Sequence, residues 1–376
     1  MQTMITEDSS ELAEISAVAK RVADQLAPGY VARDRDEFAW EIPHLLGEAG
    51  LLGLNVPVEQ GGQGAGEYVA GVVCEILGRA DSMAPSILIQ AGTVTKLLKG
   101  YGDPELAAEW VPGILSGQTV LSLAFTEEQS GSDLSNVTTK ATPVPGGWRI
   151  SGQKQSVSQS DSQAMITLAM SAEGPVMLLV PSDSEGVTRT RMSSLGRRSA
   201  GRNIVYFDDV LVPGRNVIGS VSGGVRSALR ALSASRLLVC MSLVGTARGA
   251  LEEVRNWVAS RVTFGQPLNT RQGVAFPLVD CFTDVELAEL LCIKGLRLAD
   301  AGRDFRVESA MAKAWVPRKM NDVCHECLIF LGHAGYALDS SIQLRVRDIL
   351  GAEIGEGPAN TQRMVLSRLL LGTNPG

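Results

Sequence analysis

The periodicity of the apolar residues changes twice along this chain, and these two changes constrain its fold more than any other feature. Over residues 10–116 apolar side chains recur at helical spacing, with breaks at sites rich in Gly and Pro. Over residues 119–219 they form short β-type runs separated by Gly, Pro, Ser and Asp. From Val225 onward helical spacing returns. The order predicts a helical unit, a small β unit and a second helical unit.

The last region predicts a helical bundle. One apolar face continues over several turns, and a second set of apolar residues follows it. Four long helices are expected here, and Pro317 should kink the second of these faces or mark a late start of its helix. A further helix is expected over residues 361–371. The two faces consist of Leu237, Met241, Val244, Ala247, Leu251, Val254 and Val258, then Met320, Cys324, Cys327 and Leu331.

Length and charge narrow the class of protein. With 376 residues, two or three domains are expected. The net charge is −7, and no basic run indicates a nucleic-acid partner. No signal peptide and no apolar run long enough to span a bilayer is present, so we expect a cytoplasmic protein with no membrane partner.

Cysteine and histidine spacing gives little support for a metal site. Cys324 and Cys327 form the only Cys-x-x-Cys pair, and without a second ligand pair, core packing is the favoured interpretation. His44, His325 and His333 show no common spacing and are expected to be surface or hydrogen-bonded residues. The sequence therefore predicts no metal.

Five motifs, together with the order of the three regions, resemble the acyl-CoA dehydrogenase superfamily over residues 41–371. Several motifs in the right order are a far more specific signal than any one of them. They are Ala124-Phe-Thr126-Glu127-Glu-Gln-Ser-Gly131-Ser132-Asp133; Ile150-Ser-Gly152-Gln-Lys154; Phe207-Asp-Asp-Val-Leu-Val-Pro213 followed by Gly219 and Gly223-Gly224; Arg261-Val-Thr263-Phe264-Gly265-Gln-Pro-Leu with Gln272; and Arg347-Asp348 with Ile354-Gly-Glu356-Gly357 and Gln362-Arg363.

The resemblance implies a mainly α fold with a central β domain. It predicts an N-terminal α-helical domain over residues 1–118 and a small β-barrel or sandwich domain over residues 119–222. A C-terminal four-helix bundle over residues 223–376 completes the chain. It also implies FAD as cofactor, an acyl thioester as substrate, and a homodimer or homotetramer.

The first two motifs are expected to bind the flavin. Hydroxyls and backbone N–H groups beside a glycine can approach a flat ring closely. By resemblance Phe125 and Thr126 contact the flavin, and Ser132 lies beside the phosphopantetheine arm of the thioester. Ser158 stands where the family has Thr and keeps a hydroxyl, whereas Ser156 stands where the family has Trp. The lost aromatic ring is expected to leave the flavin more open or to alter its potential.

The fourth motif is the most specific of the five. A planar guanidinium with a nearby hydroxyl and amide suits a pyrophosphate, although an Arg that complements a helix dipole before a Gly turn is the simpler alternative. The resemblance implies that Arg261, Thr263, Phe264 and Gln272 clasp the FAD of a neighbouring subunit. His333 and Gly335 lie in a segment similar to the adenosine loop of the family, with His333 in place of a usual Gly.

The fifth motif places Glu356 at the position of the catalytic base, beside Gly357 at the substrate. Two residues depart from the family pattern here, Gly355 in place of an aromatic and Pro358 in place of Thr. Glu353 is the rival carboxylate and is expected to be solvated at a helix end. A buried site is expected to raise the pKa of the base.

The substrate entrance involves a second stretch of the chain. Arg236 matches a family Arg near this entrance. Ser235, directly before it, occupies the site where a minority of relatives carry an alternative base, and serine is not basic enough for that role. Glu356 is therefore the only predicted base.

The expected reaction is α,β-dehydrogenation of an acyl thioester, carried by CoA or by an acyl carrier protein. The base removes the α-proton, a hydride leaves the β-carbon, and the electron acceptor is unknown. Two alternatives stay open. One is a flavin-dependent monooxygenase on the same scaffold, against which Glu356 argues. The other is a scaffold that only binds, which the retained Arg261, Gln272 and Glu356 disfavour.

Overall fold

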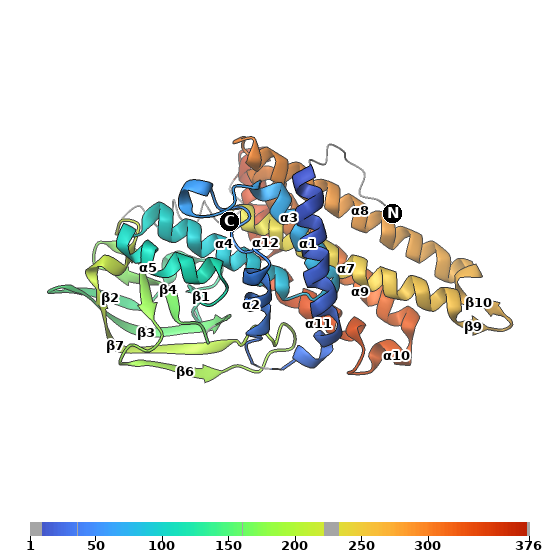
Figure 1. Ribbon diagram of the computed structural model, residues 1–376, viewed down its shortest axis with the longest axis horizontal. Helices are drawn as coiled ribbons and strands as arrows, with labels where there is room; N and C mark the ends of the chain where they lie inside the picture. The colour runs from blue at the N-terminus through green and yellow to red at the C-terminus, as the bar shows by residue number, and fades with distance from the viewer. Residues whose placement is uncertain (1–9, 36, 160, 222–232, 374–376) are drawn as a thin grey trace.

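The computed structural model describes residues 10–35, 37–159, 161–221 and 233–373. Gly223 and Gly224, and the predicted boundary at residues 222 and 223, lie outside the described residues. In the described part the chain forms a helical unit, a β-sheet and a second helical unit (Figure 1). None of the described helices is both long enough and apolar enough to cross a membrane.

The N-terminal unit is helical, as its periodicity predicts. Helix α5 begins where Asp103 accepts hydrogen bonds from the backbone N–H groups of Glu105 and Leu106 and where Pro104 opens the first turn. The helices of the N-terminal unit are α1 (Ser10–Leu26), α2 (Glu41–Glu48), α3 (Gly66–Ala80), α4 (Ala84–Tyr101) and α5 (Pro104–Leu115).

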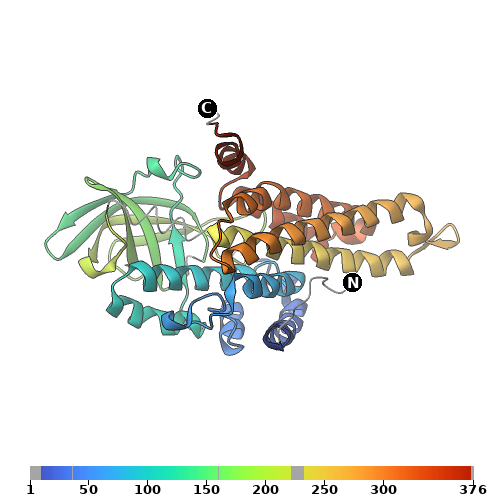
Figure 2. The same ribbon diagram turned by 90° about the horizontal axis from the view of Figure 1, so that it is seen from above.

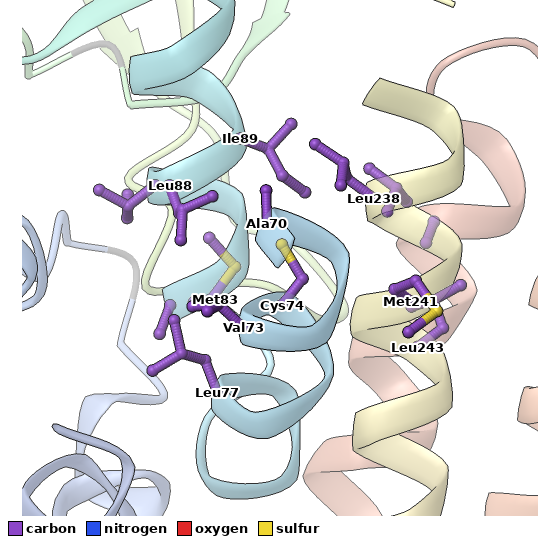
Figure 3. Packing of buried hydrophobic residues seen from close by; sticks show 14 of the residues in the cluster. Ala70, Val73, Cys74, Leu77, Met83, Leu88, Ile89, Leu238, Met241 and Leu243 are labelled. Carbon is purple, nitrogen blue, oxygen red and sulfur yellow. The ribbon is translucent and has the colours of Figure 1, made fainter. Parts of the chain in front are cut away.

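Helix α3 lies against α4 on one side and against α7 (Ser233–Ser260) on the other, and this contact forms the centre of the main core (Figure 3). The backbones of α3 and α7 approach closely because glycines lie at the contact. A Cβ atom on Gly245 would lie 2.0 Å from the carbonyl oxygen of Glu75, and one on Gly78 would lie 2.4 Å from that of Ser242. The position of α7 is therefore set by its packing on α3.

The middle unit is a single mixed sheet. The strand order is β6-β7-β3-β2-β4-β5-β8, and β1 pairs with β4. The β1–β4 and β2–β4 pairs are parallel and the other pairs are antiparallel. The strands are β1 (Leu121–Ala124), β2 (Lys140–Val144), β3 (Gly147–Val157), β4 (Ala164–Ser171), β5 (Gly174–Pro181), β6 (Val187–Arg191), β7 (Asn203–Pro213) and β8 (Val217–Ile218).

Of the two forms predicted for this unit, a barrel or a sandwich, the described strands do not form a closed barrel. Among the described residues its end strands β6 and β8 do not pair, so the ladder stays open although the sheet curls strongly (Figure 2). Strand β1 lies off this path, paired in parallel with β4, and packs against α4.

The C-terminal unit contains the expected bundle of four long helices, α7, α8 (Gln272–Asp300), α9 (Arg306–Leu331) and α11 (Ser341–Ile354). The alternative of a late start at Pro317 is wrong, because α9 begins eleven residues earlier at Arg306 and runs through Pro317. The short elements are the hairpin strands β9 (Val262–Thr263) and β10 (Gln266–Pro267), α10 (His333–Tyr336) and α12 (Ala359–Leu366), followed by a π-turn at Ser367–Leu371.

One buried carboxylate joins the three units. Asp348 in α11 accepts hydrogen bonds from Tyr30 at 3.0 Å, from Ser82, and from the backbone N–H of Arg197 in the loop after β6. Burial raises the pKa of Asp348, and these hydrogen bonds oppose that effect. The contact holds α11 against both the first helical unit and the sheet, and so fixes the helix that leads to Glu356.

Candidate active site

The first predicted flavin motif lies in the loop that follows β1. The side chains of Thr126 and Ser132 are exposed, and Phe125 is half-buried against the main core. This loop, called the flavin loop below, thus carries two exposed hydroxyl groups and one half-buried aromatic ring.

A buried ion pair holds this loop. The Glu127 carboxylate accepts hydrogen bonds from Lys154 Nζ at 2.7 Å and from the N–H and hydroxyl groups of Thr138 and Thr139. Lys154, whose side chain is 0% exposed, also donates to the Phe125 carbonyl oxygen at 3.2 Å. Burial acts to raise the pKa of Glu127, but the hydrogen bonds outweigh it and lower the pKa to about 2. The carboxylate is therefore ionised and fully engaged, so its role is structural.

The same network brings the second flavin motif to the first. The backbone N–H of Gln155 donates to the Thr126 carbonyl oxygen at 2.8 Å. Ser156, the next residue, has a positive φ of 54°, a conformation that non-glycine residues seldom adopt without a local cause. Ser156 and Ser158 are half-buried. The structure thus joins the two motifs at Thr126 and Gln155, and Ser156 and Ser158 follow directly in the chain.

The predicted pyrophosphate residues lie in the hairpin between α7 and α8. Arg261 and Gln272 are exposed, and Phe264, at the turn, is 96% exposed with a φ of 49°. Arg271 holds the turn because its guanidinium donates to the Thr263 carbonyl oxygen at 2.8 Å. Arg261 lies over the ring of Trp257, 5.8 Å from its centroid.

Within one chain this hairpin does not meet the flavin loop. Figures 1 and 2 show β9 and β10 at one end of the molecule and the sheet at the other, with the length of the bundle between them. One copy of the chain therefore cannot bring Arg261 and Thr126 to the same cofactor.

The predicted base stands on the loop between α11 and α12. Glu356 has a φ of 56° and follows Gly355, where α11 has ended. The start of α7 holds it from two sides: Arg236 Nε donates to the Glu356 carbonyl oxygen at 3.2 Å, and Ser235 Oγ donates to Glu356 Oε2 at 3.3 Å. Gln362 donates to the Gly357 carbonyl oxygen at 3.2 Å. The predicted residues Glu356, Gly357 and Arg236 are thus brought together.

Two expectations about the carboxylates need correction. The Glu356 side chain is exposed rather than buried, because its loop carries it beyond the last turn of α11. Glu353 is half-buried rather than solvated, and its Oε1 is buried without a hydrogen-bond partner in the described structure. Helical geometry explains the second result, since Glu353 lies in the final turn of α11, while Glu356 lies past it.

A small pocket lies directly behind Ser235. Its lining mixes polar and apolar side chains and includes an ion pair between Lys96 in α4 and Glu67 in α3. Asn55 donates to the same Glu67 carboxylate at 2.7 Å. No signal in the sequence marks this pocket, because its residues come from a loop and three helices that only the fold brings together. The lining residues are Asn55, Glu67, Thr93, Lys96, Leu97, Ala234, Ser235 and Leu238.

The remaining predicted residues lie elsewhere. His333 is exposed on α10 and Gly335 is buried beside it. Cys324 and Cys327 are buried in the main core, which confirms their packing role, and burial raises the pKa of the Cys324 thiol to about 12. His325 is exposed and His44 is half-buried near Trp40.

Four residues that support the site were not predicted. Glu127 and Lys154 occur within the two flavin motifs, and a charged residue inside an otherwise small and polar loop was an available signal. Arg271 had no comparable signal. Lys313, on the apolar face of α9 between Ala312 and Val316, could have been found as a lone charge on a buried face.

Comparison with known proteins agrees with this architecture. Family models for the N-terminal, middle and C-terminal domains of acyl-CoA dehydrogenase match residues 7–118, 122–210 and 222–371. Acyl-CoA dehydrogenase FadE12 of Mycobacterium tuberculosis is 30% identical over 321 residues, which cover 83% of each chain. The chain belongs to the acyl-CoA dehydrogenase family. A second member of the family, probable acyl-CoA dehydrogenase YngJ of Bacillus subtilis, is 28% identical over 89% of this chain and 90% of its own.

Solved structures of the acyl-CoA dehydrogenase family share the fold over its whole length. A glutaryl-CoA dehydrogenase of Mycobacterium smegmatis in complex with FADH2 superposes with a TM-score of 0.93 at 22% identity, over 98% of this chain and 96% of that one. Butyryl-CoA dehydrogenase of Megasphaera elsdenii superposes with a TM-score of 0.92 at 23% identity, over 98% of this chain and 100% of that one.

Proposed function

We propose that this protein is an FAD-dependent dehydrogenase that introduces an α,β double bond into an acyl thioester, with Glu356 as the base. Family membership supports the reaction class. The observation that carries the residue assignment is the loop after α11, where a carboxylate on a positive-φ residue is held by the first turns of α7. Such conformations concentrate at functional sites, where the surrounding structure maintains them.

The chain's own residues account for the proton step. Glu356 removes the α-proton, and its backbone N–H would donate to the thioester carbonyl oxygen, where negative charge develops. Arg236 holds the carbonyl side of Glu356, so the peptide orientation is set before the substrate arrives. Ser235 donates to the carboxylate and orients it.

The residues present fit FAD. Thr126, Ser156 and Ser158 offer hydroxyl groups and Phe125 an aromatic ring, a set that suits a flat ring bearing hydrogen-bonding atoms. The strained backbone at Ser156 points to the same conclusion. Ser132, with its exposed hydroxyl, would lie by the carrier arm of the thioester. When bound, FAD supplies the acceptor for the hydride that leaves the β-carbon.

The second group of predicted FAD-binding residues requires another copy of the chain. Arg261, Thr263, Phe264 and Gln272 offer a guanidinium, a hydroxyl, an exposed aromatic ring and an amide, which suit a pyrophosphate and its flanking rings. Because they lie far from the flavin loop of their own chain, we propose that they bind the FAD of a neighbouring subunit in a homodimer or homotetramer. His333 and Gly335 would contact the adenosine part.

The carrier of the acyl group is CoA or an acyl carrier protein. The test is anaerobic reduction of the protein-bound flavin by a panel of acyl-CoA and acyl-carrier-protein thioesters. Glu356→Gln keeps the size of the side chain but not its proton affinity, and should slow flavin reduction by about 10²- to 10⁴-fold. Exchange of the substrate α-hydrogen with deuterated solvent should stop, while FAD remains bound.

Glu353→Gln is the matched control and should leave the rate within a few-fold. If it abolishes reduction while Glu356→Gln does not, Glu353 is the base. If both variants reduce normally with NAD(P)H and consume oxygen, the protein is instead a flavin-dependent monooxygenase.

A further inference from the structure

A lysine lies buried inside the C-terminal bundle, close to the loop that carries Glu356. Lys313 is on α9 and is 1% exposed, which makes it one of the largest fully buried side chains of the described structure. Its neighbours Ala312 and Val316 are also buried. An isolated ammonium is costly to bury, so a position like this one needs a compensating interaction.

The interaction is with the end of α11. Lys313 Nζ donates to the Ala352 carbonyl oxygen at 2.9 Å. The last four carbonyl groups of a helix have no partner within the helix, and a positive charge at this end also complements the helix dipole. Ala352 lies in the final turn of α11, which ends at Ile354, two residues before Glu356. The ammonium therefore anchors the turn from which the Glu356 loop departs.

The loop is thus held at both ends of a short span. On one side Lys313 holds Ala352, and on the other Arg236 and Ser235 hold Glu356 itself. Burial lowers the pKa of Lys313; Cys240 and Glu356 oppose that effect, whereas Arg236 adds to it.

We propose that Lys313 is a positioning residue for the α-proton base. By holding the Ala352 carbonyl it fixes the end of α11, and thereby the place where the Glu356 carboxylate meets the substrate. A shift of about 1 Å in a reacting group can cost about 10²-fold in rate. The proposal rests on the proposed role of Glu356, and extends it to a residue that touches neither substrate nor cofactor.

The test compares Lys313→Met, which cannot donate a hydrogen bond, with Lys313→Gln, which can. Flavin reduction by butyryl-CoA is followed anaerobically at varied concentration. Lys313→Met should keep FAD and change KM by less than a few-fold, while the maximal rate of reduction falls by about 10- to 100-fold. Lys313→Gln should recover part of that loss. A merely structural role would lower the melting temperature in both variants without this split between rate and KM.

Lys319→Met is the matched control, because Lys319 lies on the same helix but pairs with Asp284 at the surface, and its rate should equal that of the wild type. Glu356→Gln is measured alongside. If Glu356→Gln is slow and Lys313→Met reduces flavin at the wild-type rate, the positioning role is wrong and the proposed function stands. If Glu356→Gln itself reduces flavin at the wild-type rate, the proposed function fails. Should Lys313→Met not fold, Lys313→Ala is measured with and without added ethylamine. A rate that ethylamine raises supports the positioning role, and a wild-type rate without ethylamine overturns it.

Discussion

Two buried lysines lie in two halves of the candidate site, and their surroundings differ. Lys154 lies under the flavin loop, where the Glu127 carboxylate is saturated by hydrogen bonds from Lys154, Thr138 and Thr139. Lys313 lies under the base loop and donates to a neutral carbonyl, while the nearby Glu356 carboxylate takes a longer hydrogen bond from Ser235 at 3.3 Å. A carboxylate that is fully engaged holds structure, and one that is loosely engaged can accept a proton. The ion pair of Glu127 and Lys154, called the scaffold pair below, is therefore structural, whereas the Glu356 carboxylate is available for proton transfer.

The largest expected effect breaks the scaffold pair. Lys154→Met leaves the Glu127 carboxylate buried without its counter-charge, and such removals cost about 3 to 5 kcal/mol of unfolding free energy. Urea denaturation at pH 7 measures the loss. The double variant Glu127→Gln with Lys154→Met removes both charges and should recover most of it. If the double variant is as unstable as the single one, shape rather than charge holds the loop.

The pH dependence of stability should also come from the scaffold pair. The pKa of Glu127 is lowered from 4.5 to about 2, so its contribution is complete above pH 4.5 and is lost as pH falls through 2. The shift corresponds to about 3 kcal/mol. Denaturation between pH 6 and pH 2.5 should show this loss in the wild type and in Glu356→Gln. It should be smaller in the double variant, and equal slopes in all three would contradict the assignment.

A smaller stability effect is expected at the second lysine. Lys313→Met leaves the Ala352 carbonyl unpaired, which costs about 1 to 3 kcal/mol, but it also removes a buried charge that burial disfavours. The two effects oppose each other, so the net loss of unfolding free energy should stay below about 2 kcal/mol. A loss as large as that of Lys154→Met would mean that the two lysines do the same structural work.

The smallest expected effect concerns the backbone at the base. With Glu356 at a φ of 56°, glycine fits the conformation better than alanine, so Glu356→Gly should be more stable than Glu356→Ala by about 1 kcal/mol. At Glu353, inside α11, the order should reverse, since glycine in a helix costs about 1 kcal/mol relative to alanine. Thermal unfolding of the four variants checks both signs. The same order at both positions would show that the loop after α11 is not strained.

The sequence by itself determined the order of the units, the bundle and the position of Glu356. Apolar periodicity encodes which face of an element is buried, and motif spacing from Arg347 and Asp348 is local enough to count along the chain. The departures at Ser156 and Pro358 could also be seen there. These features involve residues close together in the sequence, so they can be recognised without knowing which elements pack against each other.

Only the tertiary structure decided which charges meet. Glu127 and Lys154 are 27 residues apart, and Lys313 lies 39 residues from Ala352, so their contacts depend on how strands and helices pack. The fold also places the Arg261 hairpin far from the flavin loop, and it leaves the described end strands β6 and β8 unpaired with each other. Periodicity places a side chain inside or outside, but its partner comes from another element, and long-range packing alone brings the two together.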